Sequence, residues 1–152
     1  MGRRASGHQG DFRILIADTD ADWVKTLVTG FRRRGLVARH ATRGDHAIRL
    51  ARAHRFSLVM VDVTLEDMTG YELVNYLKAI DRRIPLVMTI GDHRAECEIQ
   101  ARQAGVIYYA PKPIEVSRLV ALASRVIASA SPADFEPALA TGLAGFGTDI
   151  ER

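Results

Sequence analysis

The chain has 152 residues, of which 47% are hydrophobic and 26% are charged, and its formal net charge is +3. These values predict one globular domain with a real core and exclude a disordered or highly charged chain. Cys97 is the only cysteine, which excludes an internal disulfide and a cysteine metal cluster. We find neither a membrane-spanning apolar run nor a secretory signal, so we expect a cytoplasmic protein that makes no membrane contact.

Apolar strands alternate with amphipathic helices along the chain. Residues 1–11 are polar and predict a loose lead-in, and residues 131–152, rich in Ala, Gly and Pro, predict a tail; the domain is expected at 12–130. The expected strands are 12–17, 36–41, 57–61, 86–90 and 106–110. The expected helices are 20–34, 45–54, 71–80, 92–104 and 115–128, with a loop at 64–70. This alternation predicts an α/β fold, a doubly wound parallel sheet with helices on both faces.

Three charged residues follow three of these strands: Asp18, Asp62 and Lys112. Right-handed crossovers bring the carboxyl ends of parallel strands to one edge, where ligands bind in such sheets. Two carboxylates and an ammonium there suit Mg²⁺ and a phosphoryl group, and a carboxylate can itself accept the phosphoryl group. The five histidines lie in polar surroundings and are interpreted as surface residues.

Five segments carry a resemblance to a known family: residues 14–18 (ILIAD), 58–62 (LVMVD), 68–70 (MTG), 85–88 (PLVM) and 112–113 (KP). In order and spacing the chain resembles a response-regulator receiver domain of two-component signalling over residues 12–128. The resemblance implies a flavodoxin-like sheet of strand order 2-1-3-4-5. It also implies a phosphoprotein, not an enzyme acting on a separate substrate, whose partner is a histidine kinase or a phosphotransfer protein.

The resemblance also implies a role for each site residue. Asp62 would accept the phosphoryl group and Lys112 would contact it. Asp18, Asp62 and the backbone carbonyl of Thr64 would hold Mg²⁺. Tyr109 matches the switch aromatic, and the peptide bond between Lys112 and Pro113 would be cis, which would aim the lysine at Asp62.

The chain departs from the family pattern at two positions. Thr19 stands where the family usually has a second acid, so one carboxylate that would face Mg²⁺ is missing. An attraction between two unit charges at ~4 Å is worth about 4 kcal/mol at an effective dielectric near 20, so Mg²⁺ binding should be weakened. Asp20 or Glu66 could compensate, although Asp20 is favoured as a helix cap and Glu66 as a solvated residue. Ile90 stands where the family carries the switch Ser or Thr. The hydroxyl of Thr89 should not replace it, because successive strand residues face opposite ways.

Three interpretations follow. The favoured one is a phosphorylatable receiver with altered switching, and the alternative is a pseudo-receiver that docks proteins independently of phosphate. An enzyme that binds a nucleotide or flavin is disfavoured, because no glycine-rich turn follows the first strand. We expect docking to a partner, or self-association, through 92–104, 106–110 and 115–128, where Leu122 lies off the inner stripe of its helix. The arginines at 32–34 indicate a solvated helix end, and no nucleic-acid contact is expected.

Overall fold

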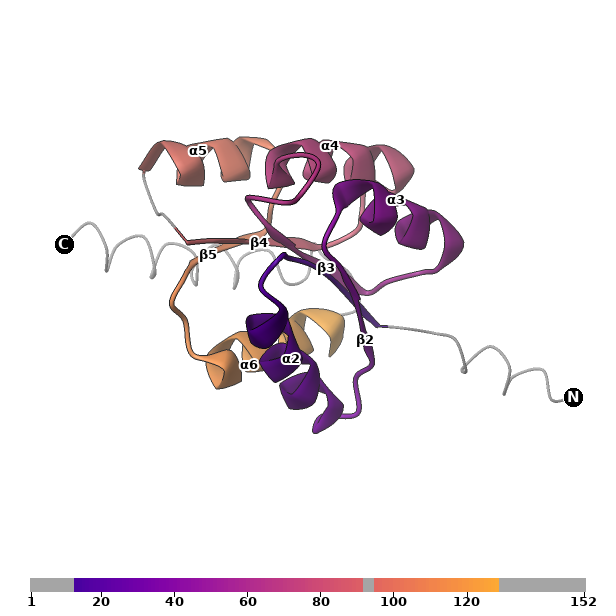
Figure 1. The fold of residues 1–152 in the computed structure, drawn as a ribbon, viewed down its shortest axis with the longest axis vertical. Helices are drawn as coiled ribbons and strands as arrows, with labels where there is room; N and C mark the ends of the chain where they lie inside the picture. Colours follow the sequence, from indigo (N-terminus) through magenta and orange to yellow (C-terminus); the bar gives the residue numbers. More distant parts are fainter. Residues whose placement is uncertain (1–12, 92–94, 129–152) are drawn as a thin grey trace, which may run out of the picture.

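Five parallel strands form one sheet in the order β2-β1-β3-β4-β5, as predicted (Figure 1). The computed structural model describes residues 13–91 and 95–128, so the predicted lead-in and tail, and the start of the helix predicted at 92–104, lie outside the described residues. The strands are β1 (Ile14–Ala17), β2 (Ala38–Ala41), β3 (Leu58–Asp62), β4 (Leu86–Ile90) and β5 (Tyr108–Pro111). The helices are α2 (Ala21–Arg32), α3 (Gly44–Ala53), α4 (Gly70–Ile80), α5 (Ala95–Gln103) and α6 (Val116–Ala128).

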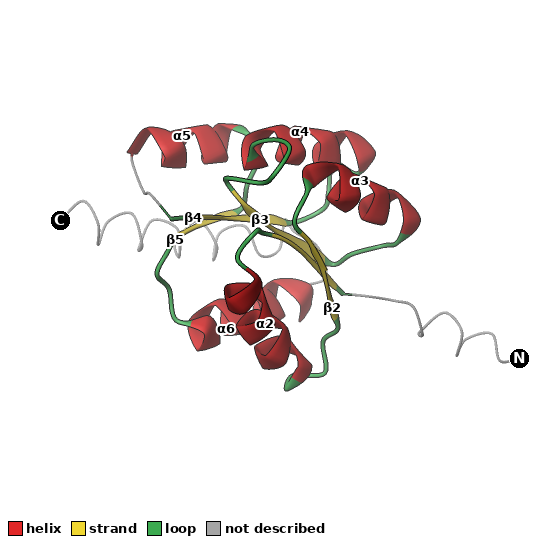
Figure 2. Ribbon diagram, in the orientation of Figure 1, coloured by secondary structure: helices red, strands yellow, loops and turns green. Residues whose placement is uncertain are grey.

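The sheet lies between two helical layers. Helices α3, α4 and α5 cover one face, and α2 and α6 cover the other (Figures 1 and 2). Strands β1, β3 and β4 are buried along their whole length, whereas β2 at the edge buries only its last residue. That difference follows the sequence, because β1, β3 and β4 are nearly all apolar and β2 is half polar. No helix in the described part is long and apolar enough to cross a membrane.

Several predicted element boundaries differ from the structure by one or two residues; β2, for example, begins at Ala38 rather than at 36. Two of these differences have a clear physical cause. The fifth strand begins at Tyr108 rather than at 106, because the Val106 amide instead donates to the carbonyl of Ala101 and closes the end of α5. The predicted loop at 64–70 ends one residue early, since Gly70 is already the first residue of α4. Thr69 caps that helix by a reciprocal pair of hydrogen bonds with Glu72, an arrangement that fixes where a helix begins.

The segment between β3 and α4 is fixed against the start of α3. Thr64 and Thr69 pair as an isolated antiparallel bridge. Between them, the Asp67 carboxylate accepts the amide of Gly44 at 2.6 Å and that of the next residue at 3.0 Å. The carboxylate thereby supplies the partners that a helix amino terminus lacks. This segment directly follows Asp62, so its anchoring holds the carboxyl end of β3 in place.

Gly70→Ala should destabilise the protein strongly. A Cβ at this position would lie 2.4 Å from the backbone oxygen of Asp62 and 2.9 Å from the Cα of Val63, so the backbone itself would have to move. Overpacking costs about 1–3 kcal/mol, and a clash with backbone should reach the upper end of that range. Urea unfolding measures the loss. Gly91→Ala is the matched control, because its Cβ would meet nothing within 4 Å; equal losses in the two variants would contradict the argument.

Candidate functional site

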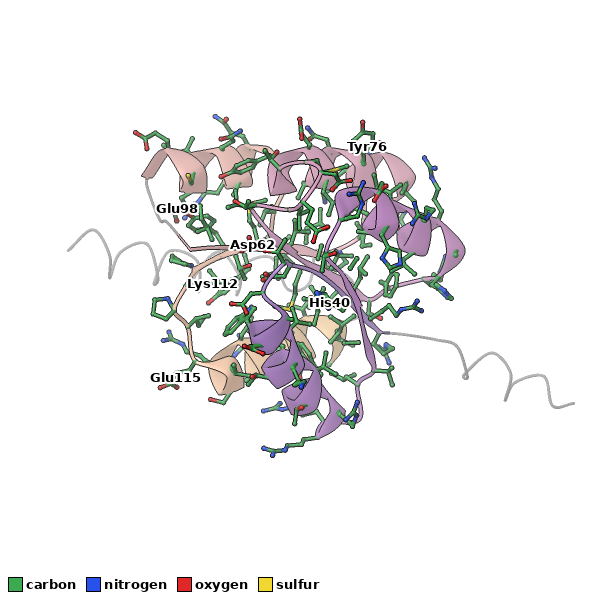
Figure 3. The ribbon with its side chains drawn as sticks, in the orientation of Figure 1. His40, Asp62, Tyr76, Glu98, Lys112 and Glu115 are labelled. Carbon is green, nitrogen blue, oxygen red and sulfur yellow. The ribbon has the colours of Figure 1, made fainter. Side chains whose placement is uncertain are left out.

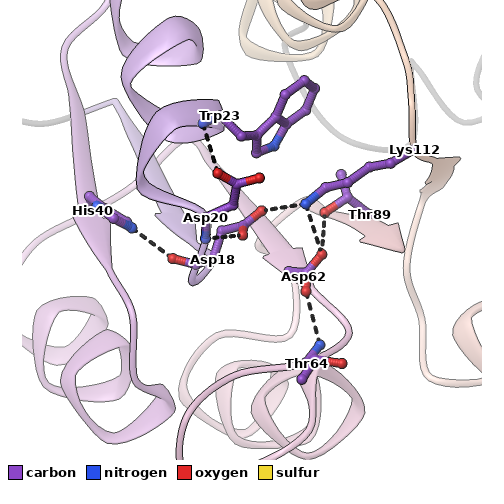
Figure 4. A network of polar contacts seen from close by, with 8 residues as sticks. All are labelled: Asp18, Asp20, Trp23, His40, Asp62, Thr64, Thr89 and Lys112. Atoms are coloured by element: carbon purple, nitrogen blue, oxygen red, sulfur yellow. Dashed lines mark hydrogen bonds and ion pairs between the residues drawn. The ribbon is translucent and has the colours of Figure 1, made fainter. Parts of the chain in front are cut away.

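The three predicted charges meet at the carboxyl edge of the sheet (Figure 4), and Figure 3 shows where Asp62 and Lys112 lie in the whole domain. The Nζ atom of Lys112 lies 3.0 Å from Oδ2 of Asp18 and 3.2 Å from Oδ1 of Asp62. The residues come from the ends of β1, β3 and β5, which the topology places at one rim. The lysine is itself positioned by its amide, which donates to the Ile90 carbonyl at 2.7 Å. The prediction that folding unites positions 18, 62 and 112 is confirmed.

Each carboxylate is oriented by a backbone amide two residues further along the chain. The amide of Asp20 donates to Oδ1 of Asp18 at 2.9 Å, and the amide of Thr64 donates to Oδ2 of Asp62 at 3.1 Å. Such Asx-type turns form locally and need no distant partner. They leave the other oxygen of each carboxylate directed at Lys112, so the site is preorganised by its own loops.

The site carries one more negative charge than positive when both carboxylates are ionised. The side chains of Asp18 and Asp62 are 3% and 11% exposed, and that of Lys112 is 20% exposed. Burial raises the pKa of Asp18 above its ordinary value, and the nearby Asp62 charge adds to that rise. Burial alone would lower the pKa of Lys112, but its hydrogen bond with Asp18 and the two carboxylate charges raise it. The lysine is therefore charged at neutral pH, and the pocket favours a further cation.

The raised pKa of Asp18 predicts a specific pH dependence of stability. The folded protein holds the Asp18 proton more tightly than the unfolded chain does, so Asp18 favours folding below its ordinary pKa near 3.8. That contribution disappears as the pH rises through the folded-state pKa. The free energy of unfolding of the wild type, minus that of Asp18→Asn, should therefore increase as the pH falls from about 7 to about 4. Urea unfolding without Mg²⁺ measures it; a difference that shrinks at low pH would show that burial does not raise the pKa of Asp18.

Thr89 reaches the site, contrary to the sequence prediction. Its hydroxyl donates to Oδ1 of Asp62 at 3.3 Å, and the residue is only 2% exposed. The prediction failed because it compared Thr89 with its neighbour Ile90 and not with β3. In the sheet Thr89 lies opposite Asp62, and residues opposite each other on adjacent strands face the same way. Ile90 is buried beside the same pocket and supplies no hydroxyl.

Three further residues shape the surroundings of the charges (Figure 4). The Asp20 carboxylate accepts the amide of Trp23 at 3.1 Å, which confirms its predicted role as a helix cap. The Trp23 ring lies 5.3 Å from Nζ of Lys112, a cation–π contact. His40 was predicted to be a surface residue, but its Nε2 lies 2.7 Å from the Asp18 carbonyl oxygen. Its place on β2, next to β1, is the signal that could have revealed this contact.

The charges line an open pocket of about 520 Å³. Thr19, Asp20 and Thr64 also line it, whereas Glu66 does not and is exposed. Among the described residues no three His, Cys, Asp or Glu side chains form a metal-binding group. Two buried carboxylates with one net negative charge nevertheless fit Mg²⁺, which accepts one or two carboxylates and retains several waters. Asp18, Asp62 and the Thr64 carbonyl are the candidate ligands.

Two predicted features of the site remain. Tyr109 is only 1% exposed and belongs to the core, and its role as the switch aromatic stays a prediction. The Lys112–Pro113 peptide bond is cis, as the resemblance implied.

Comparison with known proteins decides the family. A family model described as the response regulator receiver domain matches residues 14–124. The chain belongs to the response regulator receiver domain family. A receiver protein of Anaeromyxobacter is 34% identical over 111 residues, 72% of this chain and 46% of that protein. The transcriptional regulatory protein PrrA of Mycobacterium tuberculosis is 28% identical over 109 residues, 72% of this chain and 47% of PrrA. The receiver chain thus spans about half the length of these relatives.

Solved structures agree with the receiver fold. A CheY-like receiver domain from Methanospirillum hungatei superposes with a TM-score of 0.72 at 22% identity, covering 77% of this chain and 94% of that one. A Burkholderia pseudomallei response regulator, described with a phosphorylated aspartic acid, a calcium ion and citrate, gives a TM-score of 0.68 at 29% identity. That comparison covers 76% of this chain and 71% of the other. This chain is therefore a receiver module of two-component response regulators.

Proposed function

We propose that this receiver accepts a phosphoryl group on Asp62 from a histidine kinase or a phosphotransfer protein. The observation that carries the proposal is the Asp62 carboxylate, held by the Thr64 amide and faced by the Lys112 ammonium at 3.2 Å. Phosphoryl transfer depends mainly on positioning and on neutralising charge, and these residues supply both.

The proposed step joins a carboxylate oxygen of Asp62 to phosphorus as the bond from phosphorus to the donor's imidazole nitrogen breaks. The electron pair of that bond leaves with the imidazole, and an acyl phosphate remains on Asp62. Lys112 offsets the charge on the phosphoryl oxygens as a point charge. Bound Mg²⁺, held by Asp18, Asp62 and the Thr64 carbonyl, would supply further charge neutralisation. The Thr89 hydroxyl is close enough to Asp62 to donate to a phosphoryl oxygen, so we assign it the donor role that Ile90 cannot fill.

Intact-mass measurement tests the proposal. Incubation of the full chain with acetyl phosphate and Mg²⁺ should add the mass of one phosphoryl group, and EDTA should suppress the gain. A chain that gains no mass from acetyl phosphate, and none from a panel of phosphorylated histidine phosphotransfer proteins, would instead be a pseudo-receiver.

We further propose that α5, β5 and α6 form the surface that docks a partner or a second copy of this chain. Leu122, the residue that suggested this surface, is half-buried and packs against the core, so it gives weaker support than expected. Ile99 on α5 gives better support, because it is 56% exposed although it is a large apolar residue.

Ile99→Glu should weaken self-association of the phosphorylated protein, or its binding to the partner, by about tenfold or more, because burying an isoleucine is worth about 1.5–3 kcal/mol. Sedimentation velocity measures self-association. Val37→Glu is the matched control, since Val37 is 51% exposed and lies just before β2, at the opposite edge of the sheet. An effect of Val37→Glu as large as that of Ile99→Glu would contradict this choice of surface.

A further inference from the structure

A second cavity, of about 570 Å³, is lined by residues of α2, by the two residues after it and by residues of α6. These two helices cover the face of the sheet away from α3, α4 and α5 (Figure 2). The α2 side of the cavity carries the cations Lys25, Arg33 and Arg34, all exposed. Its α6 side is lined by Val116, which is half-buried, and by Val120, of which only 3% is exposed. We call this cavity the α2–α6 groove. One wall is basic and the other is apolar, so the groove suits a short segment that is both acidic and apolar.

The three cations of the groove have no carboxylate partner within the part of the chain that the structure describes: none of them forms an ion pair there. Lys25 lies in the first half of α2, and Arg33 and Arg34 follow its carboxyl end, so three like charges face one cavity. An anion bound there would offset their charge. The groove therefore offers positive charge that no described carboxylate neutralises. It is separate from the phosphoacceptor pocket at the sheet edge.

The sequence contains a segment of the required kind directly after α6. Residues 129–152 include four acidic residues and one basic residue, so they carry a net charge of −3 while the rest of the chain carries +6. Within them, residues 132–137 read Pro-Ala-Asp-Phe-Glu-Pro. In an extended segment Asp134 and Glu136 face one way and Phe135 the other, which matches a groove with one basic and one apolar wall. The proline that follows Glu136 favours an extended backbone there.

The connection is long enough for this segment to reach the groove. From the end of α6 at Ala128 back to Ser117, which lines the groove, the helix spans 11 residues, or about 16 Å at ~1.5 Å per residue. Residues 129–134 can span about 20 Å when extended. A short tether also holds the segment at an effective concentration on the order of millimolar, so even weak ion pairs suffice for occupancy.

We propose that residues 132–137 bind in the α2–α6 groove of their own chain. Asp134 and Glu136 pair with the basic wall formed by Lys25, Arg33 and Arg34, and Phe135 packs on the apolar wall. This contact goes beyond phosphoryl transfer and does not require it. It also involves the helix that carries Trp23, the neighbour of Lys112, and so places the tail on an element that borders the phosphoacceptor pocket.

Zero-length cross-linking of the unphosphorylated full chain tests the contact. A water-soluble carbodiimide joins a carboxylate to a lysine amine only when the two touch, and this chain has just three lysines: Lys25, Lys78 and Lys112. Lys78 lies on α4 in the opposite helical layer and serves as the internal control (Figure 1). Peptide mass spectrometry should show Lys25 joined to Asp134 or Glu136 in a yield roughly tenfold above that for Lys78, because binding in the groove would raise the local concentration of these carboxylates at Lys25 and not at Lys78.

Two further measurements decide the interpretation. An equal mixture of ¹⁵N-labelled and unlabelled chains should give only products of a single isotope, and mixed products would show that the tail of a second copy fills the groove. The double variant Arg33→Gln with Arg34→Gln leaves every cross-linkable group in place but removes two charges of the basic wall, so it should lower the yield of the Lys25 cross-link several-fold. A salt concentration of about 1 M NaCl should lower that yield as well, because the Debye length there is about 3 Å. Equal yields at Lys25 and Lys78, mixed-isotope products, or a yield indifferent to both changes would overturn the proposal.

Discussion

Asp62→Asn should abolish the gain of one phosphoryl mass from acetyl phosphate. The amide of Asn is a far poorer nucleophile than a carboxylate, and no second carboxylate in the described part of the chain is placed like Asp62, which is paired with both Lys112 and the Thr89 hydroxyl. Asn keeps the shape of Asp and an oxygen that can accept the Thr64 amide, so the fold should survive. Intact mass measures the product, and circular dichroism confirms that the variant is folded.

Two matched variants make this result specific. Thr89→Val keeps the acceptor carboxylate and the volume of the side chain, so the phosphoryl group should still be added, with a changed rate or lifetime. Asp18→Asn also keeps the acceptor but removes a candidate ligand of Mg²⁺, so its labelling should need more Mg²⁺ than the wild type needs. A phosphoryl mass that persists in Asp62→Asn would place the acceptor elsewhere and remove the central residue of the proposed function.

The site could be predicted where it depends on chain topology and could not where it depends on strand register. Asp18, Asp62 and Lys112 each follow an apolar run, and parallel strands bring those ends together whatever the details of packing. Thr89 was misjudged because its partner is set by the pairing of β3 with β4, which the sequence of β4 alone does not show. His40 was missed for the same reason: it contacts the Asp18 carbonyl from β2, an element with no signal of its own in the motif.

For the fold too, the arrangement of the elements could be predicted from the sequence, whereas their exact ends could not. Alternating strands and helices fix the layers, whereas the ends of elements depend on individual hydrogen bonds. Thr69 and Glu72 form a capping box that the sequence displays and that places the start of α4. The Asp67 carboxylate, by contrast, caps α3 from a distant loop, and no local pattern reveals such a contact. Glu66, a predicted alternative metal ligand, is exposed and lies outside the pocket lining, and its neighbour Asp67 binds the start of α3 instead.

Lys112→Met should lower the free energy of unfolding by about 3 kcal/mol at low Mg²⁺, the lower end of the range for removing one partner of a buried ion pair. The lower end applies because the lysine side chain is 20% exposed. The variant leaves Asp18 and Asp62 close together with no cation between them, and it also removes the contact with Trp23. Methionine fills much of the same volume, so the loss would report charge rather than a cavity. Urea unfolding, followed by the fluorescence of Trp23, the only tryptophan in the chain, measures it.

Lys78→Met is the matched control: in the part of the chain that the structure describes, Lys78 donates a hydrogen bond to the Arg82 carbonyl at 3.2 Å and forms no ion pair like that of Lys112, so the variant should lose about 1 kcal/mol. Removing a second charge should reverse part of the effect: Asp18→Asn in the Lys112→Met background leaves a single carboxylate and should recover stability. Mg²⁺ should also stabilise Lys112→Met more than it stabilises the wild type, because a cation binds more tightly where one more negative charge is unmatched, and binding to the folded state adds directly to stability. Equal losses in Lys112→Met and Lys78→Met, with no differential response to Mg²⁺, would mean that the lysine does not balance the two carboxylates.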